Sequence, residues 1–198
     1  MNYKITFLLV VMIISVRLKG QDSGFLNGYI ITNSNDTIVG LVKYVNQVPY
    51  RVLVDIKFKE TEKSKTKVYP PETILGYKAE SKIFHSLKDP DYSGKQFMEL
   101  IIDGYVRLYT STVTSFGASQ YGSANSSSNY LLKTGDKVLF SVDKKFKERV
   151  SEYLSDNEVV SGKIRNGVYK KSDIEEIIKE YNGSKQTKWF YDLKHQSL

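Results

Sequence analysis

Residues 28–44 read GYIITNSNDTIVGLVKY and carry the clearest structural signal in the chain. Two runs rich in β-branched residues, Tyr29–Thr32 and Thr37–Tyr44, flank the polar segment Asn33–Asp36. Asn, Ser and Asp tolerate left-handed backbone conformations and form local side-chain hydrogen bonds, so they favour a tight turn. This stretch therefore predicts a β-hairpin and points to an antiparallel sheet.

The strand pattern continues through the middle of the chain. Val52–Phe58 has apolar residues at alternate positions, and the charged run after it predicts a solvated turn leading into Val68–Tyr69. Pro70 and Pro71 end that strand because proline lacks a backbone N–H. Further strands are expected at 75–79, 82–85, 96–102, 105–112, 130–132 and 138–140.

One stretch interrupts this pattern. Ser115–Asn129 (SFGASQYGSANSSSN) is rich in Ser, Gly, Ala and Asn and offers little to bury. Such composition is typical of flexible connections. We therefore expect a mobile Ser/Gly-rich loop over residues 113–129.

From residue 143 onward the apolar spacing becomes helical. Phe146, Val150 and Tyr153 recur at four- and three-residue steps, and a second short helix is expected over 157–164.

A third helix has the strongest pattern. Ser172 and Glu175 have the spacing of a capping box, and apolar residues follow at helical intervals from Ile174 to Tyr181. Asn182–Gly183 is expected to end this helix.

These patterns together predict an α+β fold. An antiparallel β-rich region over 21–142, as a sheet or a small barrel, is followed by about three helices over 143–198 that pack on it. The 198 residues are 40% hydrophobic, which is enough for one core. The chain has no cysteine, so disulfides, thiolate metal ligands and cysteine nucleophiles are excluded.

The first twenty residues predict a signal peptide. Lys4 precedes the apolar run Ile5–Val16, which is twelve residues long. A permanent membrane helix needs about 20 apolar residues, so the run fits a signal better than an anchor. Cleavage is expected after Gly20. We expect no transmembrane segment in the mature chain, which would be periplasmic, associated with the outer membrane, or secreted.

Charge argues against nucleic-acid binding. The net charge of +7 falls to +4 when residues 1–20 are removed, because they hold Lys4, Arg17 and Lys19 and no acid. So small a surplus is typical of a solvated surface.

Three segments resemble a known group of proteins: Gly28–Tyr44, Tyr69–Ile74 (YPPETI) and Tyr169–Asn182 (YKKSDIEEIIKEYN). With the export signal, they resemble uncharacterised exported proteins of the Bacteroidetes type. The resemblance covers most of the mature chain and implies compartment and architecture. None of its motifs is catalytic, and the Ser-rich stretch 115–129 departs from it.

Residues that could carry chemistry are few. Only His85 and His195 are present as histidines, and no nucleophile, phosphate-loop or metalloprotease motif occurs. We therefore predict no catalytic residue, no metal and no cofactor. Four acids on strand-like segments leave a carboxylate-based hydrolase of polysaccharide or peptidoglycan as the alternative. They are Asp55, Glu80, Glu99 and Asp103.

Trp189, Phe190 and Tyr191 are the most distinctive candidates for a binding surface, because contiguous aromatics are costly to leave in water. The favoured interpretation is that they dock back on the domain as a terminal strand, and the alternative is a partner-binding tail. On these grounds the chain is expected to be a non-enzymatic binding module of the cell envelope or a secreted one, with an envelope protein or a glycan as partner.

Overall fold

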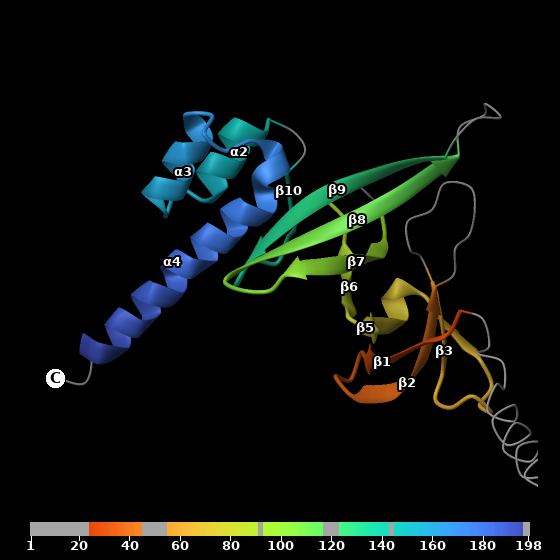
Figure 1. Ribbon diagram of the computed structural model, residues 1–198. Helices are drawn as coiled ribbons and strands as arrows, with labels where there is room; N and C mark the ends of the chain where they lie inside the picture. Colours follow the sequence, from red (N-terminus) through yellow and green to blue (C-terminus); the bar gives the residue numbers. More distant parts are fainter. Residues whose placement is uncertain (1–23, 45–54, 91–92, 117–122, 143–144, 196–198) are drawn as a thin grey trace, which may run out of the picture.

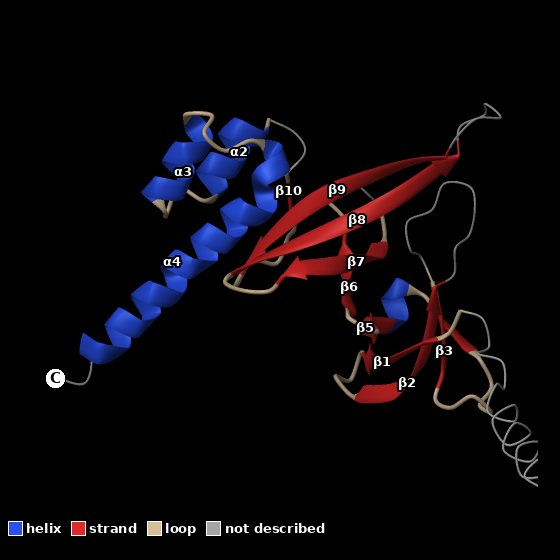
Figure 2. Ribbon diagram, in the orientation of Figure 1, coloured by secondary structure: helices blue, strands red, loops and turns tan. Residues whose placement is uncertain are grey.

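The computed structural model describes residues 24–44, 55–90, 93–116, 123–142 and 145–195 (Figure 1). The expected signal peptide, residues 1–20, lies outside this range. The predicted α+β class is confirmed: a ten-stranded antiparallel sheet is followed by three α-helices in the described part of the chain (Figure 2). Over these ranges, no helix is both long and apolar enough to cross a membrane.

All ten strands belong to one sheet, in the order β10-β9-β8-β7-β6-β5-β1-β2-β3-β4. Their bounds are β1 Leu26–Thr32, β2 Thr37–Tyr44, β3 Ile56–Lys59, β4 Lys67–Tyr69, β5 Ile74–Ala79, β6 Lys82–Lys88, β7 Lys95–Ile102, β8 Val106–Phe116, β9 Ser123–Lys133 and β10 Phe140–Ser141. A short 3-10 helix, η1 (Pro71–Thr73), follows the proline pair before β5.

The hairpin predicted from residues 28–44 is confirmed as β1 and β2. Ile30 lies opposite Ile38, and Asn35 in the turn has the left-handed φ of 69°. The Oγ1 of Thr32 accepts the backbone N–H of Asp36 at 3.1 Å, which closes the turn. On its other side β1 pairs with β5, where Ile30 lies opposite Tyr77.

The prediction of a mobile loop over 113–129 is wrong at both of its ends. Residues up to Phe116 belong to β8 and residues from Ser123 belong to β9, with Val113 opposite Ser126. Residues 117–122 lie outside the described range. Composition misled because a strand ladder pairs backbone groups whatever the side chain, so a Ser-rich segment can pair with a β-prone strand.

The helical region contains α2 (Phe146–Tyr153), α3 (Glu158–Arg165), the 3-10 turn η2 (Lys171–Asp173) and α4 (Ile174–His195). The first two helices match the prediction. Asn157 caps α3, since its side chain accepts the backbone N–H of Val160 at 3.1 Å.

Both predicted ends of the third helix are wrong. The capping box lies two residues earlier than Ser172, because the Asp173 carboxylate accepts the backbone N–H of Lys170 at 2.8 Å. The helix also continues through Asn182–Gly183 to His195. The Asn182 side chain bonds the backbone of another strand instead of its own helix end, and one glycine inside a helix costs only about 1 kcal/mol.

The N-terminal half of the sheet curls around an aromatic core. The ring centroids of Tyr44 on β2 and Phe84 on β6 lie 5.8 Å apart, although β1 and β5 lie between these two strands. In a flat sheet the backbones of β2 and β6 would be about 14 Å apart. Gly28 allows this close packing, since a Cβ there would lie 1.8 Å from the backbone oxygen of Lys78. The aromatic core comprises Ile30, Val42, Ile56, Phe58, Ile74, Tyr77, Ala79, Phe84 and Phe97.

The C-terminal half of the sheet is covered by the helices instead. Val106 and Leu108 on β8 and Leu131 on β9 pack against Ile177 and neighbouring residues of the helices. We call this cluster the helix-covered core. It comprises Val106, Leu108, Leu131, Val142, Val150, Leu154, Val160, Ile164, Tyr169, Ile174, Ile177, Ile178 and Tyr181.

Candidate functional site

A row of directly opposed residues crosses one face of the sheet between the two cores. Directly opposed residues of an antiparallel pair share a face, so the register places the whole row on one side. The row changes in character from apolar through acidic to neutral polar. It runs Ile30, Tyr77, Phe84, Glu99, Thr110 and Asn129, on β1, β5, β6, β7, β8 and β9.

The polar end of this row opens into a cavity between the sheet and the start of α4. Its volume is about 830 Å³, within the range of ligand pockets. We call it the sheet–helix groove. The sheet contributes Ile101, Leu108, Thr110 and Asn129, and the start of α4 with η2 contributes 171–176 and Lys179.

Several charges in the groove are satisfied locally. Asp173 accepts the Lys170 N–H and the Ser172 hydroxyl, and these hydrogen bonds hold the pKa of its carboxyl below the ordinary value. Glu175 pairs with Lys179 at 3.3 Å. The Glu176 carboxylate and the Asn129 side-chain amide, by contrast, form no hydrogen bond or ion pair with the described residues. These two groups are therefore available to a ligand.

Beside the groove, Glu99 is followed in the row by the aromatic residues Phe84 and Tyr77. Lys82 pairs with Glu99 at 3.0 Å. Burial, and then the charges of Glu99 and Glu80, raise the pKa of the Tyr44 hydroxyl. Tyr77 is fully buried, stacks on Phe84 at 4.6 Å, and its hydroxyl has no hydrogen-bond partner among the described residues.

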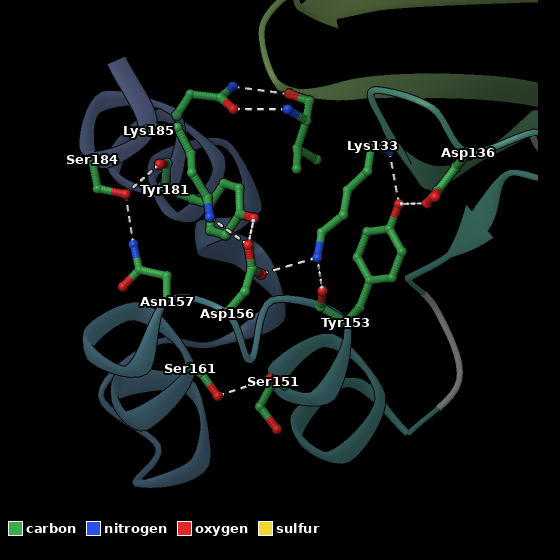
Figure 3. Close-up of polar contacts among 12 residues, drawn as sticks. Lys133, Asp136, Ser151, Tyr153, Asp156, Asn157, Ser161, Tyr181, Ser184 and Lys185 are labelled. Atoms are coloured by element: carbon green, nitrogen blue, oxygen red, sulfur yellow. Dashed lines mark hydrogen bonds and ion pairs between the residues drawn. The ribbon is translucent and has the colours of Figure 1, made fainter. Parts of the chain in front are cut away.

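A polar cluster fixes the helices that form the other wall of the groove (Figure 3). Asp156, between α2 and α3, accepts Lys133 at 3.0 Å and the Tyr181 hydroxyl at 2.7 Å, and it also pairs with Lys185. Burial alone would raise the pKa of Asp156, but hydrogen bonds from Lys185, Tyr181 and Lys133 outweigh it and hold the pKa well below its ordinary value.

Asn182 completes the attachment of α4 to the sheet. Its amide oxygen accepts the backbone N–H of Val106 at 2.8 Å, and its amide nitrogen donates to the Val106 carbonyl at 2.9 Å. These two hydrogen bonds fix α4 to the start of β8. We call Asn182 and the Asp156 cluster together the polar latch.

The four acids considered for hydrolysis lie on separate elements. Asp55 precedes β3, Glu80 lies in the turn between β5 and β6 at φ 54°, Glu99 is in β7, and Asp103 pairs with Arg107 at 3.1 Å. Among the described groups, Glu80 and Glu99 are the two of these acids whose charges both raise the pKa of one group, the Tyr44 hydroxyl.

The two histidines lie on different elements. His85 is half-buried on β6, with its Nδ1 2.9 Å from the Tyr109 hydroxyl, and burial lowers its pKa. His195 is the last residue of α4. Among the residues that the structure describes, no group of three or more His, Cys, Asp or Glu residues could hold a metal ion.

Trp189, Phe190 and Tyr191 lie in the last part of α4, so the expectation of a terminal strand is wrong. Figure 1 shows this part of the helix projecting beyond the sheet. The positions of their side chains lie outside the described features, and their partner-binding role stays a prediction.

The groove residues were missed from the sequence. Thr110 lies in a predicted strand, Asn129 at the end of the predicted loop and Glu176 within the predicted third helix, but none of them is predicted as a site residue. No local motif marks them, because the register of β8 with β9 and the position of α4 bring them together.

Comparison of the chain with protein-family models, with curated proteins and with solved structures finds no match.

Proposed function

We propose that this protein is a non-enzymatic binding module, exported to the cell envelope or secreted, that holds part of an envelope protein or a glycan in the sheet–helix groove. The observation that supports this is the groove of about 830 Å³. In it the Glu176 carboxylate and the Asn129 amide have no hydrogen-bond or ion-pair partner among the described residues and lie beside the aliphatic Ile101, Leu108 and Ile174. Such a mixture of apolar surface and a few free polar groups suits recognition.

The state of the carboxylates supports binding over hydrolysis. A glycoside hydrolase needs two carboxyl groups within about 5 to 10 Å, one of them a general acid with a raised pKa. Glu99 and Asp103 are instead paired with Lys82 and Arg107. The pKa values of Asp156, Asp173 and Glu180 are displaced downward by their hydrogen-bond donors, opposite to the direction a general acid requires.

The export proposal rests on Lys4 and the apolar run Ile5–Val16 that follows it. Amino-terminal sequencing of the exported protein tests it. We expect a mature chain that begins at Gln21, and a chain that still begins at Met1 would contradict export by a cleaved signal.

The binding proposal is tested with purified residues 21–198 on arrays of glycans, peptidoglycan fragments and envelope proteins. Asn129→Trp fills the groove and should weaken a detected interaction at least about tenfold, roughly 1.4 kcal/mol. Val39→Trp is the matched control, because Val39 is 75% exposed on β2, away from the groove, and should leave binding unchanged. Thermal unfolding of both variants checks that they fold.

Catalysis is tested on the same ligands. Turnover of a glycan, peptidoglycan, peptide or ester that Glu99→Gln or Glu80→Gln abolishes, with the fold intact, would overturn the non-enzymatic proposal in favour of the hydrolase.

The projecting end of α4 is a second candidate for contact with a partner. Truncation after Lys188 removes Trp189, Phe190 and Tyr191. Retained folding with lost association would support a partner-binding helix end, whereas lost folding would show that these residues stabilise the domain.

A further inference from the structure

A second cavity lies between α2 and the segment that leads into β10. Its volume is about 310 Å³. It shares no residue with the sheet–helix groove. Its lining comprises Pro90, Val138, Leu139, Phe140, Ser141, Arg149 and Tyr153. We call it the Arg149 pocket.

We propose that the Arg149 pocket binds a carboxylate carried on an apolar body. The proposal rests on one guanidinium that forms no ion pair with the described residues, in a cavity lined mainly by apolar and aromatic side chains. It is independent of the function proposed for the groove.

Arg149 is held in place without using its hydrogen-bond donors. Its guanidinium carbon lies 4.8 Å from the centroid of the Phe140 ring. Its guanidinium forms no ion pair or hydrogen bond with any residue in the described ranges, and only its backbone N–H donates, to the Lys145 carbonyl at 3.0 Å. A planar guanidinium stacked on an aromatic ring keeps its N–H fork free at the edges, and that fork matches a carboxylate in a bidentate arrangement.

Two acids next to the lining residues form no ion pair with Arg149. Asp136 accepts the Tyr153 hydroxyl at 2.8 Å. Asp89, next to Pro90, is 4% exposed and accepts hydrogen bonds from Gln96 and Tyr130 at 3.0 Å. Both carboxylates are therefore engaged elsewhere, and Arg149 remains the cation that lines the cavity.

The walls of the pocket are preorganised. Tyr153 stacks on Phe140 with ring centroids 4.4 Å apart, and its hydroxyl also accepts the backbone N–H of Lys133 at 2.8 Å. Val138 is 68% exposed and would be covered by the apolar part of a ligand. Rigid walls reduce the entropy that is lost on binding. Even a small acid should therefore gain binding free energy from its contacts with Arg149 and with the apolar wall.

The test uses 3-phenylpropionate against 3-phenylpropan-1-ol, which share the apolar body and differ in charge. Calorimetry on residues 21–198 should show millimolar or tighter binding of the acid, at least about tenfold tighter than the alcohol, as expected for a charge-assisted bidentate contact. Equal binding of the two compounds, or no binding of the acid, would overturn the proposal.

Two variants locate the effect. Arg149→Met keeps an unbranched side chain against Phe140 and should weaken the acid about tenfold without changing the alcohol. Arg165→Met removes an exposed arginine at the end of α3 and should bind as the unmodified chain does. Unchanged binding by Arg149→Met, or equal loss by Arg165→Met, would contradict the assignment.

N-acetylphenylalanine and its amide then separate the two sources of such a carboxylate: tighter binding of this acid than of 3-phenylpropionate indicates a peptide C-terminus, and weaker binding indicates a free small acid.

Discussion

The two halves of the sheet cover the same kind of surface in different ways. The N-terminal half curls on itself and closes the aromatic core with backbone against backbone, at positions such as Gly28. The C-terminal half stays open and is covered by helices that the polar latch holds in position. The N-terminal half depends on close packing, and the C-terminal half depends also on hydrogen bonds and charge. Substitutions and pH should therefore change the stability of the two halves differently.

The largest loss of stability is expected in the N-terminal half, where close backbone packing leaves no room for a side chain at Gly28. Gly28→Val places side-chain atoms where the Lys78 backbone oxygen lies, 1.8 Å from the Cβ position, so β1 cannot pair with β5. We expect a loss of about 4 kcal/mol or more, or failure to fold. Urea unfolding followed by far-UV circular dichroism measures it. Gly162→Ala in α3 is the control, since nothing lies within 4 Å of its Cβ position, and it should stabilise by up to about 1 kcal/mol.

The next effect tests the helix-covered core. Ile177 is fully buried, so Ile177→Asp buries an unpaired charge and should cost about 3 to 5 kcal/mol. Ile177→Val removes one methylene group and should cost about 1 kcal/mol. Thermal unfolding distinguishes the two variants, and an unchanged melting temperature for Ile177→Asp would mean that α4 does not belong to the core in solution.

Asn182 tests the hydrogen-bonded part of the latch. Asn182→Ala leaves the N–H and the carbonyl of Val106 unpaired, which should cost about 2 to 4 kcal/mol. Asn182→Asp keeps an acceptor for the N–H but places a carboxylate against the carbonyl. Hydrogen exchange at the Val106 amide should therefore accelerate strongly in Asn182→Ala and less in Asn182→Asp. Equal protection in both variants and the unmodified chain would exclude this contact.

The smallest and most pH-dependent effect is expected at Asp156, whose side chain is 42% exposed. Allowing for solvent screening, Asp156→Asn should cost about 1 to 2 kcal/mol at pH 7. The folded pKa lies below the unfolded value of about 3.9, so this contribution is complete above pH 4 and is lost as the pH falls through the folded pKa.

Urea unfolding at pH 7 and pH 3 checks the sign. The difference between the unmodified chain and Asp156→Asn should shrink at pH 3, and a difference that grows would contradict the assignment. Glu175→Gln is the control, because its pair with Lys179 is exposed and should contribute less than about 0.5 kcal/mol at either pH.

The architecture was predictable wherever local periodicity and burial agree. The β1–β2 hairpin follows from Ile30 and Ile38 with Asn35 between them, and α2 and α3 follow from their apolar spacing. Composition failed where backbone pairing decides, as in Ser123–Asn129, because a ladder needs a partner strand and not apolar side chains. The prediction of where the third helix ends failed because Asn182, a residue that often ends helices, instead bonds Val106, which is distant in the sequence.

The candidate sites were not predictable from local patterns. Asn129 and Glu176 meet only through the sheet register and the placement of α4. Arg149 looks like any solvated arginine until Phe140 and Tyr153 are placed around it.

The strand order also has a consequence for how the chain folds. Nearly every neighbouring pair in the sheet joins strands that follow each other in sequence, and β1 with β5 is the exception. Short hairpins close quickly, whereas β1 can meet β5 only after the intervening chain through β4 forms a closed loop and loses that entropy. We expect this junction to limit the folding rate. In stopped-flow experiments, Ile30→Ala should then slow folding more than it speeds unfolding, and the reverse would place the slow step elsewhere.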